Sequence, residues 1–324
     1  ALRPLKFHPI LKQTLWGGER IIPYKELASG LSRVGESWEL SGMPGSESVV
    51  AEGPWAGSTL SELIGRFGAE LLGKANYARF GQEFPLLVKF IDAREDLSIQ
   101  VHPDDELARK RHGKSGKCEM WYVLEAEPGA SLLTGFSRPI APAEYERRVA
   151  DNTLTDVLNR QAIASGDVFY LPAGRVHSIG KGSFIVEIQQ SSDITYRIYD
   201  FDRRDAAGNS RELHTELARE AIDFESSENS RITYAPENNQ EVRLVTTPYF
   251  TTSLYTLTAR TRCDWSATDS FVAIVLLQGS GSLTDNEGNR IDVRQGETWL
   301  LPASTQWTEI TPHTAPLRLL TSRI

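Results

Sequence analysis

The sequence predicts a mainly β protein with a few short helices inserted into its first part. Short apolar or alternating runs, each ended by Gly, Pro, Asn or Asp, dominate the chain, and this pattern is typical of antiparallel strands. Only a few segments show the 3.6-residue spacing of an amphipathic helix. The 324 residues, 40% hydrophobic and 24% charged, are enough for two domains with sizeable cores.

Eight runs are the clearest predicted strands. Their apolar residues either alternate with polar ones or continue over several positions, as expected of strands buried on one or both faces. In chain order they are VGESWELSG at 34–42, FPLLVKFID at 84–92, EMWYVLEA at 119–126, DVFYLPAG at 167–174, SFIVEIQQ at 183–190, VRLVTTPYF at 242–250, FVAIVLLQG at 271–279 and ETWLLPAS at 297–304.

Helical spacing interrupts this pattern. It predicts helices over residues 59–73, where Ser58 or Thr59 is placed to act as N-cap, over 142–159 and over 213–222. Asp104 and Asp105 are expected to cap a further helix, DELARKRHG, and not to bind a metal.

A linker is predicted at residues 225–240, ESSENSRITYAPENNQ, which are rich in Ser, Asn, Glu and Pro. We therefore expect two domains, residues 1–235 and residues 236–324.

Composition narrows the classes of function. A formal net charge of −8 and a pI near 5.4 argue against a general affinity for nucleic acid or anionic membranes. No run of 18 or more apolar residues occurs, and the first residues lack the apolar segment of a secretory signal, so a cytoplasmic location is expected. The two cysteines are too few and too far apart for a disulfide framework. Nothing in the sequence indicates the oligomeric state.

An internal repeat supports two related units. GDVFYLPA at 166–173 recurs as GETWLLPA at 296–303, each time after an apolar strand and a glycine-bearing turn. This strand, turn and G-[DE]-x-x-x-[LI]-P-x pattern resembles the second motif of cupins, which are small jelly-roll barrels. The next strand begins with His177 in the first copy and with Trp307 in the second. We expect two cupin barrels, of which the second is degenerate and binds no metal.

The first copy contains a set of metal-ligand residue types. In the stretch LSIQVHPDD at 97–105, an extended strand places Gln100 and His102 on one face. With Glu119 and His177 they form an N/O set that suits a divalent ion such as Zn²⁺ and leaves a position open for water or substrate. From spacing alone, ordinary surface or core histidines are an equal alternative.

At these residues the sequence resembles the type I phosphomannose isomerases, which are metal-dependent mannose-6-phosphate isomerases of the cupin superfamily, and in particular their shorter bacterial branch. The resemblance rests on LKQTLWGG at 11–18, GESWELSG at 35–42, PLLVKFIDA at 85–93, LSIQVHPDD at 97–105, KCEMWYVL at 117–124 and LPAGRVHSI at 171–179. It implies interconversion of mannose 6-phosphate and fructose 6-phosphate, a sugar phosphate as the partner, and one Zn²⁺ per chain. The implied zinc ligands are Gln100, His102, Glu119 and His177.

The resemblance also implies roles for neighbouring residues. Arg197 would be an active-site arginine suited to the negative charge that develops on O1 or O2. Lys117, which shares a strand face with Glu119, would exchange protons or hold the phosphate. Glu36 matches an acidic residue of the family and would bond sugar hydroxyls. From their positions in the sequence, Lys89 and Ser98 are also expected to bind the substrate, and Trp16 to form part of the pocket wall.

Other interpretations remain open for these residues. Lys89 and Lys117 are also compatible with solvated strand positions. Arg197 lies among acidic residues in DITYRIYDFD and is compatible with a structural ion pair, and Glu39 instead of Glu36 is an alternative inward-facing acid. A metal-dependent oxygenase, a non-catalytic sugar-binding cupin and an isomerase of an unphosphorylated sugar are the alternative functions.

Overall fold

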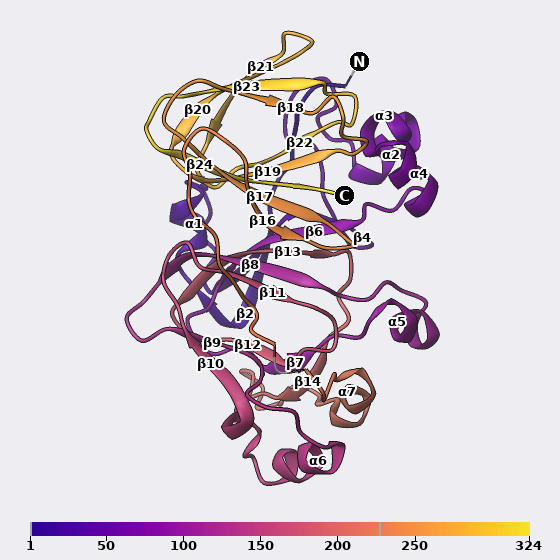
Figure 1. Ribbon diagram of the computed structural model, residues 1–324, viewed down its shortest axis with the longest axis vertical. Helices are drawn as coiled ribbons and strands as arrows, with labels where there is room; N and C mark the ends of the chain where they lie inside the picture. Colours follow the sequence, from indigo (N-terminus) through magenta and orange to yellow (C-terminus); the bar gives the residue numbers. More distant parts are fainter. Residues whose placement is uncertain (1, 227) are drawn as a thin grey trace.

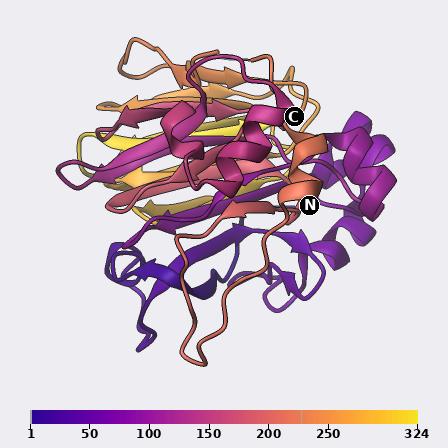
Figure 2. The same ribbon diagram turned by 90° about the horizontal axis from the view of Figure 1, so that it is seen from below.

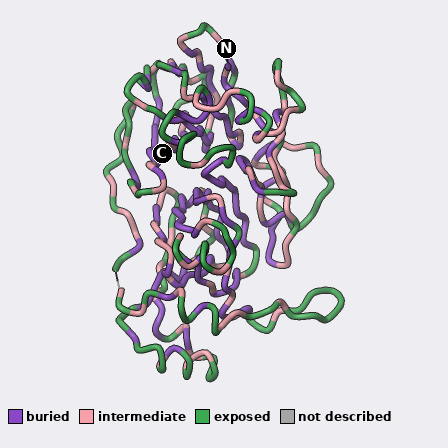
Figure 3. Tube along the Cα trace, turned by 90° about the vertical axis from the view of Figure 1, so that its right-hand side faces the viewer, coloured by how far each residue is buried: buried purple, intermediate pink, exposed green. Residues whose placement is uncertain are grey.

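The computed structural model describes residues 2–226 and 228–324, whose strands form four large sheets stacked along the long axis of the molecule (Figure 1). Between named strands every pairing is antiparallel. The predicted mainly β class is confirmed. Buried segments run through the sheets and exposed ones form their loops and edges (Figure 3).

Two sheets are built from strands that lie between residues 10 and 232. The five-stranded sheet consists, in spatial order, of β10 (Leu158–Ala162), β9 (Ser131–Phe136), β12 (His177–Ile179), β7 (Ile99–Val101) and β14 (Tyr196–Tyr199). The seven-stranded sheet consists of β15 (Arg231–Ile232), β11 (Val168–Leu171), β8 (Glu119–Ala126), β13 (Ser183–Gln190), β6 (Leu86–Asp92), β3 (Val34–Leu40) and β2 (Ile10–Gly18). A small hairpin is formed by β4 (Gly42–Met43) and β5 (Ser46–Glu47).

Two further sheets come mainly from the last part of the chain. The six-stranded sheet consists of β1 (Leu5–Lys6), β22 (Thr298–Leu301), β19 (Val272–Gln278), β24 (Leu317–Arg323), β17 (Thr251–Leu257) and β16 (Val242–Thr246). The four-stranded sheet consists of β18 (Thr261–Asp264), β23 (Trp307–Pro312), β20 (Ser280–Asp285) and β21 (Arg290–Arg294). Because β1 pairs with β22, the start of the chain is part of the six-stranded sheet.

The position of the seven-stranded sheet between two others explains how polar residues come to be buried. All residues of β6 are buried, and its side chains alternate between two cores. Val88 and Phe90 belong to the core shared with the six-stranded sheet, whereas Ile91 belongs to the core that faces the five-stranded sheet. Lys89 lies on the same face as Ile91 and is therefore enclosed between sheets.

Helices cover the ends and sides of this stack (Figures 1 and 2). They are α1 (Ile21–Tyr24), α2 (Leu60–Phe67), α3 (Ala69–Leu72), α4 (Lys74–Phe80), α5 (Asp105–His112), α6 (Pro142–Ala150), the 3₁₀ helix η1 (Leu154–Val157) and α7 (Thr215–Ala221). Apolar residues of α6, η1 and α7 form one core with the outer face of the five-stranded sheet. No helix among residues 2–226 and 228–324 has the length and apolarity needed to cross a membrane.

The predicted helices are confirmed in position, with two differences in extent. Over residues 59–73, Thr59 forms a capping box with Glu62, but Gly68, at φ 48°, separates α2 from α3. Over residues 142–159 the prediction is wrong beyond α6. Asn152 has φ 55°, and the chain turns there so that β10 pairs with β9 and buries the apolar Leu158 in the sheet. Asp104 caps α5 as predicted.

The repeated sequence motif has a structural counterpart. Gly166 and Gly296 both have positive φ, 91° and 85°, which accounts for glycine at the turn before β11 and before β22. The predicted linker at residues 225–240 carries the short strand β15, which pairs with β11 at the edge of the seven-stranded sheet.

Candidate metal centre and active site

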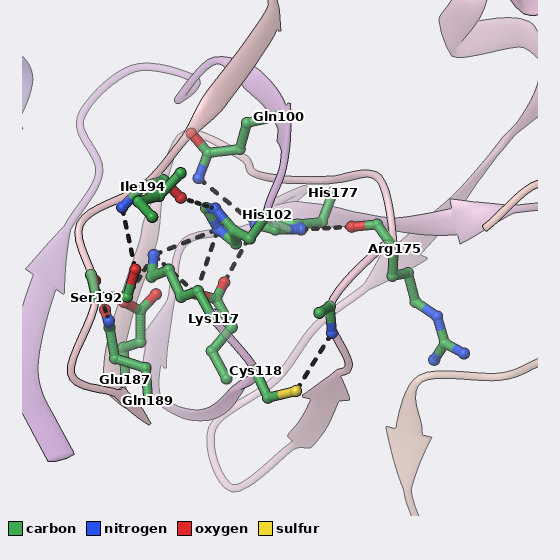
Figure 4. A network of polar contacts seen from close by, with 12 residues as sticks. Gln100, His102, Lys117, Cys118, Arg175, His177, Glu187, Gln189, Ser192 and Ile194 are labelled. Carbon is green, nitrogen blue, oxygen red and sulfur yellow. Dashed lines mark hydrogen bonds and ion pairs between the residues drawn. The ribbon is translucent and has the colours of Figure 1, made fainter. Parts of the chain in front are cut away.

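Four polar side chains converge between the five-stranded and seven-stranded sheets (Figure 4). Gln100 lies in β7 and His102 immediately follows it, while Glu119 and His177 are the first residues of β8 and β12. Gln100 and His177 are register partners on adjacent strands. The fold therefore brings together the four residues that the sequence singled out as a ligand set.

Three of these residues offer ligand atoms at short range. The atoms of His102, Glu119 and His177 all lie within 4.8 Å of one another. His177 Nε2 is 3.1 Å from Glu119 Oε1, and His102 Nε2 is 3.5 Å from Oε2. His102 Nδ1 lies 2.9 Å from the carbonyl oxygen of Ile194, and His177 Nδ1 lies 2.8 Å from that of Arg175. These contacts favour the tautomer in which each Nδ1–H donates a hydrogen bond to the carbonyl. Each Nε2 lone pair is then directed into the cluster, as metal binding requires.

The charge state of the cluster suits a cation. Burial and the nearby ammonium group of Lys117 lower the pKa of His102 to about 3, so its ring is neutral. Burial alone would raise the pKa of Glu119, but Lys117 and the two imidazoles outweigh it and hold this pKa well below its usual range. Both carboxylate oxygens of Glu119 are buried, with Lys117 Nζ 2.9 Å from Oε2 and His177 Nε2 3.1 Å from Oε1. Neither contact has the geometry of a hydrogen bond, so both oxygens keep lone pairs suited to a bound metal ion.

Gln100 completes one side of the cluster. Its Oε1 accepts a hydrogen bond from Ser98 Oγ at 3.1 Å, and its Nε2 lies 3.5 Å from His177 Nε2. In this rotamer the amide nitrogen faces the cluster, and a half-turn of the amide group exchanges it for the oxygen. Ser98 is buried and shares this strand face.

A chain of buried charges extends from the cluster along the seven-stranded sheet. Lys117 Nζ lies 2.9 Å from Glu119 Oε2 and 3.7 Å from Glu187 Oε1. Glu187 Oε1 is also 3.7 Å from Lys89 Nζ, which is 3.8 Å from Glu36 Oε1. The ammonium groups thus lie between carboxylates, and neither lysine is on a solvated surface.

The buried carboxylates shift the neighbouring pKa values. Burial by itself would lower the pKa of Lys117, but the charges of Glu119 and Glu187 outweigh burial and raise it, so this lysine stays protonated. Burial and the charge of Glu119 raise the pKa of Glu187. Glu187 was not predicted as a site residue, although it is a lone Glu in the apolar run SFIVEIQQ, as Lys89 is a lone Lys in the apolar run FPLLVKFID.

The two acids of the GESWELSG stretch face opposite sides of β3. Glu36 accepts a hydrogen bond from Trp38 Nε1 at 2.8 Å and faces Lys89. Glu39 faces the six-stranded sheet, where it forms a buried ion pair with Lys25. Of the two acids, Glu36 is therefore the one on the same side of the sheet as Lys89.

Arg197 lies across from Gln100 in the antiparallel pair of β14 and β7. Its Nη1 donates to the carbonyl of Glu212 at 2.9 Å, and its buried Nε has no hydrogen-bond partner. The structural alternative was an ion pair with Asp193, Asp200 or Asp202, and none of these pairs is formed between these residues, all of which the structure describes. Asp193 pairs with Lys114, and Asp200 pairs with Arg203 and Arg211.

His214, for which the sequence predicts only an ordinary surface or core role, is hydrogen-bonded to the backbone of Arg197. The backbone N–H of Arg197 donates to His214 Nδ1 at 3.1 Å, and the backbone N–H of His214 donates to the carbonyl of Arg197 at 2.7 Å. Trp16 belongs to the apolar cluster that also contains Ile91 and Trp121, inside the space between the two sheets.

The chain is similar to known proteins over more than nine-tenths of its length. Residues 5–133 match the model of the phosphomannose isomerase type I catalytic domain. The chain is 34% identical to the probable mannose-6-phosphate isomerase GmuF of Bacillus subtilis over 93% of both chains. It is 33% identical to the mannose-6-phosphate isomerase of Streptococcus mutans over 92% of both. The chain belongs to the type I phosphomannose isomerase family. It is therefore an isomerase.

Solved structures of the family agree with this membership. The crystal structure of the mannose 6-phosphate isomerase from Bacillus subtilis superimposes with a TM-score of 0.89, at 30% identity and with 99% of each chain covered. A putative mannosephosphate isomerase from Archaeoglobus fulgidus shares the fold, with a TM-score of 0.78 at 21% identity. Within this phosphomannose isomerase fold, His102, Glu119 and His177 form a candidate metal site.

Proposed function

We propose that the protein interconverts mannose 6-phosphate and fructose 6-phosphate by moving a proton between C1 and C2 through an enediol or enediolate. The observation that carries this proposal is the buried cluster of His102, Glu119 and His177, with ligand atoms within 4.8 Å, in a chain of the phosphomannose isomerase family. Proton removal next to a carbonyl needs positive charge near the developing oxyanion, and the cluster and its lysines lie in a position to provide it.

We propose one Zn²⁺ per chain, held by Gln100, His102, Glu119 and His177. Two neutral imidazoles, a carboxylate and an amide oxygen are an acceptable donor set for this ion. When bound, the ion supplies positive charge and Lewis acidity beside the carbonyl of the sugar.

The charged side chains around the cluster have distinct roles in this proposal. Arg197, whose Nε is buried and free of a hydrogen bond, donates to the negative charge on O1 or O2. Lys117 remains protonated and adds a fixed positive charge beside the reacting carbons. Glu187, between Lys117 and Lys89, keeps both ammonium groups in place. All three act by preorganised electrostatics.

Residues further from the cluster are proposed to bind the substrate. Lys89 and Ser98 would bind the phosphate group or sugar oxygens, and Glu36 would accept hydrogen bonds from sugar hydroxyls. Trp16 would form part of the apolar wall of the site.

We further propose that the sheets form two cupin barrels. Residues 1–235 would be the catalytic domain, and residues 236–324 a degenerate barrel without a metal site. The interior of the second unit supports this difference, because the cluster between the six-stranded and four-stranded sheets consists of apolar residues such as Trp265, Leu276 and Trp299.

The first test is a coupled assay of mannose 6-phosphate conversion with and without a chelator. We expect turnover to be lost after chelation and restored by Zn²⁺. Full turnover in chelated protein whose metal content is verified to be negligible would contradict the metal-dependent mechanism.

A second test concerns the phosphate group. Lys89, proposed to bind the phosphate, is a cationic group that free mannose cannot use, so part of the binding energy of the phosphate is expected in turnover. Mannose 6-phosphate should exceed mannose by at least about two orders of magnitude in kcat/KM, equivalent to roughly 2.7 kcal/mol. Equal efficiency on both sugars would show an isomerase of unphosphorylated sugars instead.

A further inference from the structure

A second concave site lies on the opposite side of the five-stranded sheet from the metal cluster. It is a cavity of about 340 Å³, lined on its floor by Ile99 of β7 and Ile198 of β14. Gln100 and Arg197, the residues next to these in the chain, are register partners, and Gln100 belongs to the metal cluster on the inner side of the sheet. The cavity is therefore separate from the proposed active site, although both use the same two strands.

The cavity is a gap in the helical layer that covers this sheet. Val149 of α6 and Leu154 of η1 form one wall, and Phe201 and Leu213, at the two ends of the exposed loop that follows β14, form the other. Elsewhere this face of the sheet is sealed by apolar residues of the helices. A cavity of this size, partly enclosed and with a mixed apolar and polar lining, is within the range of small-molecule sites.

Two large apolar side chains at the rim of the cavity are exposed to solvent. In the described part of the chain five large hydrophobic residues are exposed, and two of them, Phe201 and Leu213, line this one cavity, with 37% and 48% of their surface accessible. Phe201 and Asp202 also have positive φ, 57° and 52°. Two consecutive non-glycine residues in this region are energetically unfavourable, and strain of this kind is concentrated at functional sites. Phe201 packs edge-on against Tyr199, with ring centroids 4.9 Å apart, which leaves aromatic surface at the mouth.

Two arginines, Arg148 and Arg160, also line this cavity. Arg148 lies 2.8 Å from Glu144, so its charge is already compensated. Arg160 differs, because its Nη1 donates only to the hydroxyl of Ser131, at 3.0 Å, and no ion pair joins it to a carboxylate within residues 2–226 and 228–324. The lining residues include no Asp or Glu. The uncompensated charge at the mouth of this partly apolar cavity therefore favours an anionic ligand.

We propose that this cavity binds a small organic anion with an apolar body, whose anionic group lies at Arg160 and whose apolar part lies between Phe201, Leu213 and the floor of the two strands. This combination follows from the cavity chemistry. An apolar molecule without charge would leave the arginine unused, and an inorganic anion would gain nothing from the apolar walls.

The test uses 1-anilinonaphthalene-8-sulfonate as the probe, titrated into the metal-loaded protein of 324 residues and followed by fluorescence. Its uncharged analogue, N-phenyl-1-naphthylamine, is titrated in parallel. Leu213→Glu places a carboxylate at the rim, and Arg160→Gln removes the cation. The matched controls are Leu31→Glu, at a residue of similar exposure (43%) that does not line the cavity, and Arg290→Gln on the exposed face of β21.

We expect the sulfonate to bind wild type with a dissociation constant below 1 mM and at least about threefold tighter than its uncharged analogue, equivalent to roughly 0.7 kcal/mol. Leu213→Glu should weaken binding about tenfold or more and Arg160→Gln about threefold, with both controls unchanged. Thermal unfolding of all four variants checks that they fold. Equal effects of Leu213→Glu and Leu31→Glu would overturn the proposal, as would wild-type binding weaker than 1 mM or equal binding of the two probes.

Discussion

At the scale of single residues, the candidate metal site depends on side chains that are fixed by neighbouring backbone. Each imidazole is oriented by a carbonyl acceptor on its Nδ1 atom, so that Nε2 faces Glu119. Such support keeps ligand atoms in position before a metal binds and raises the affinity of the site. The loss of one imidazole removes both a ligand and part of this preorganised geometry.

His102→Ala or His177→Ala is therefore expected to abolish stoichiometric metal binding. Elemental analysis of the purified protein should find about one metal ion per chain in wild type and less than a tenth of that in either variant. His313→Ala, at an exposed histidine far along the chain, is the matched control and should keep its metal. Full metal content in both cluster variants would refute the ligand assignment.

His214 allows a test of how the position of Arg197 affects turnover. His214→Phe keeps a ring of similar size beside Tyr196 but removes the acceptor for the Arg197 N–H, whereas His214→Asn keeps an acceptor oxygen and loses the ring. We expect His214→Phe to lower kcat about tenfold at unchanged metal content, because a displaced donor loses part of its electrostatic effect.

His214→Asn should retain most of the wild-type kcat, because it keeps an acceptor for the Arg197 N–H. Hydrogen exchange of the peptide that contains Arg197 provides an independent measurement, and exchange should be faster in His214→Phe than in His214→Asn. Equal kcat and equal exchange in the two variants would show that His214 contributes only packing.

At the scale of elements, strands were predicted well and their neighbours in space were not. The apolar run PLLVKFID identifies β6, and the two-residue period of a strand places Lys89 on one face, but only the strand pairing shows that Glu187 is its cross-strand partner. That partnership joins residues far apart in sequence, so local periodicity carries no signal for it. The same limit explains residues 158–162, where pairing with β9 overrides the helical spacing of the preceding segment.

β14 is an edge strand of its sheet, and the segment around residues 211–214 lies along it. Asp200, directly after β14, accepts hydrogen bonds from Arg211 at 2.6 Å and 2.9 Å and from Arg203 at 2.9 Å. Burial alone would raise the pKa of Asp200, but these two guanidinium groups outweigh burial and lower it. The Asp200 carboxylate therefore links the start of the exposed loop after β14 to Arg211 near its end through hydrogen bonds.

Asp200→Asn is expected to reduce the free energy of unfolding by about 2 kcal/mol at pH 7, as for other buried hydrogen bonds to charged groups. Because the pKa of Asp200 is lower in the folded state, its stabilising effect is complete above the unfolded value near pH 4 and is lost as the pH falls through the folded value. Urea unfolding of wild type and variant should thus show a difference that shrinks below about pH 4. Asp193→Asn, at an exposed ion pair with Lys114, should cost less than about 0.5 kcal/mol at either pH.

At the scale of the whole molecule, the metal-bearing sheets and the last sheets share one core. The largest apolar cluster contains residues of the seven-stranded and the six-stranded sheets together, and the rings of Phe84 and Phe271 meet there at 4.8 Å. Tyr24 donates to the carbonyl of Leu277 at 2.6 Å, and the buried Lys25 binds the carbonyl of Gly296. The sequence repeat suggested two units but contained no sign of this shared core, since the contacts join positions about 180 to 270 residues apart.

This shared core predicts that the two units unfold together. Phe271→Ala removes a fully buried ring next to β19, far in sequence from the metal cluster, and is expected to cost about 3–5 kcal/mol of unfolding free energy. If the units depend on each other, wild type and variant should each unfold in a single transition, and bound metal should be released in that same transition. Phe201→Ala, at an exposed ring, is the control and should cost less than about 1 kcal/mol. Separate calorimetric transitions in Phe271→Ala, with metal still bound after the first, would show instead that the metal-bearing unit is stable without the core that the six-stranded sheet provides.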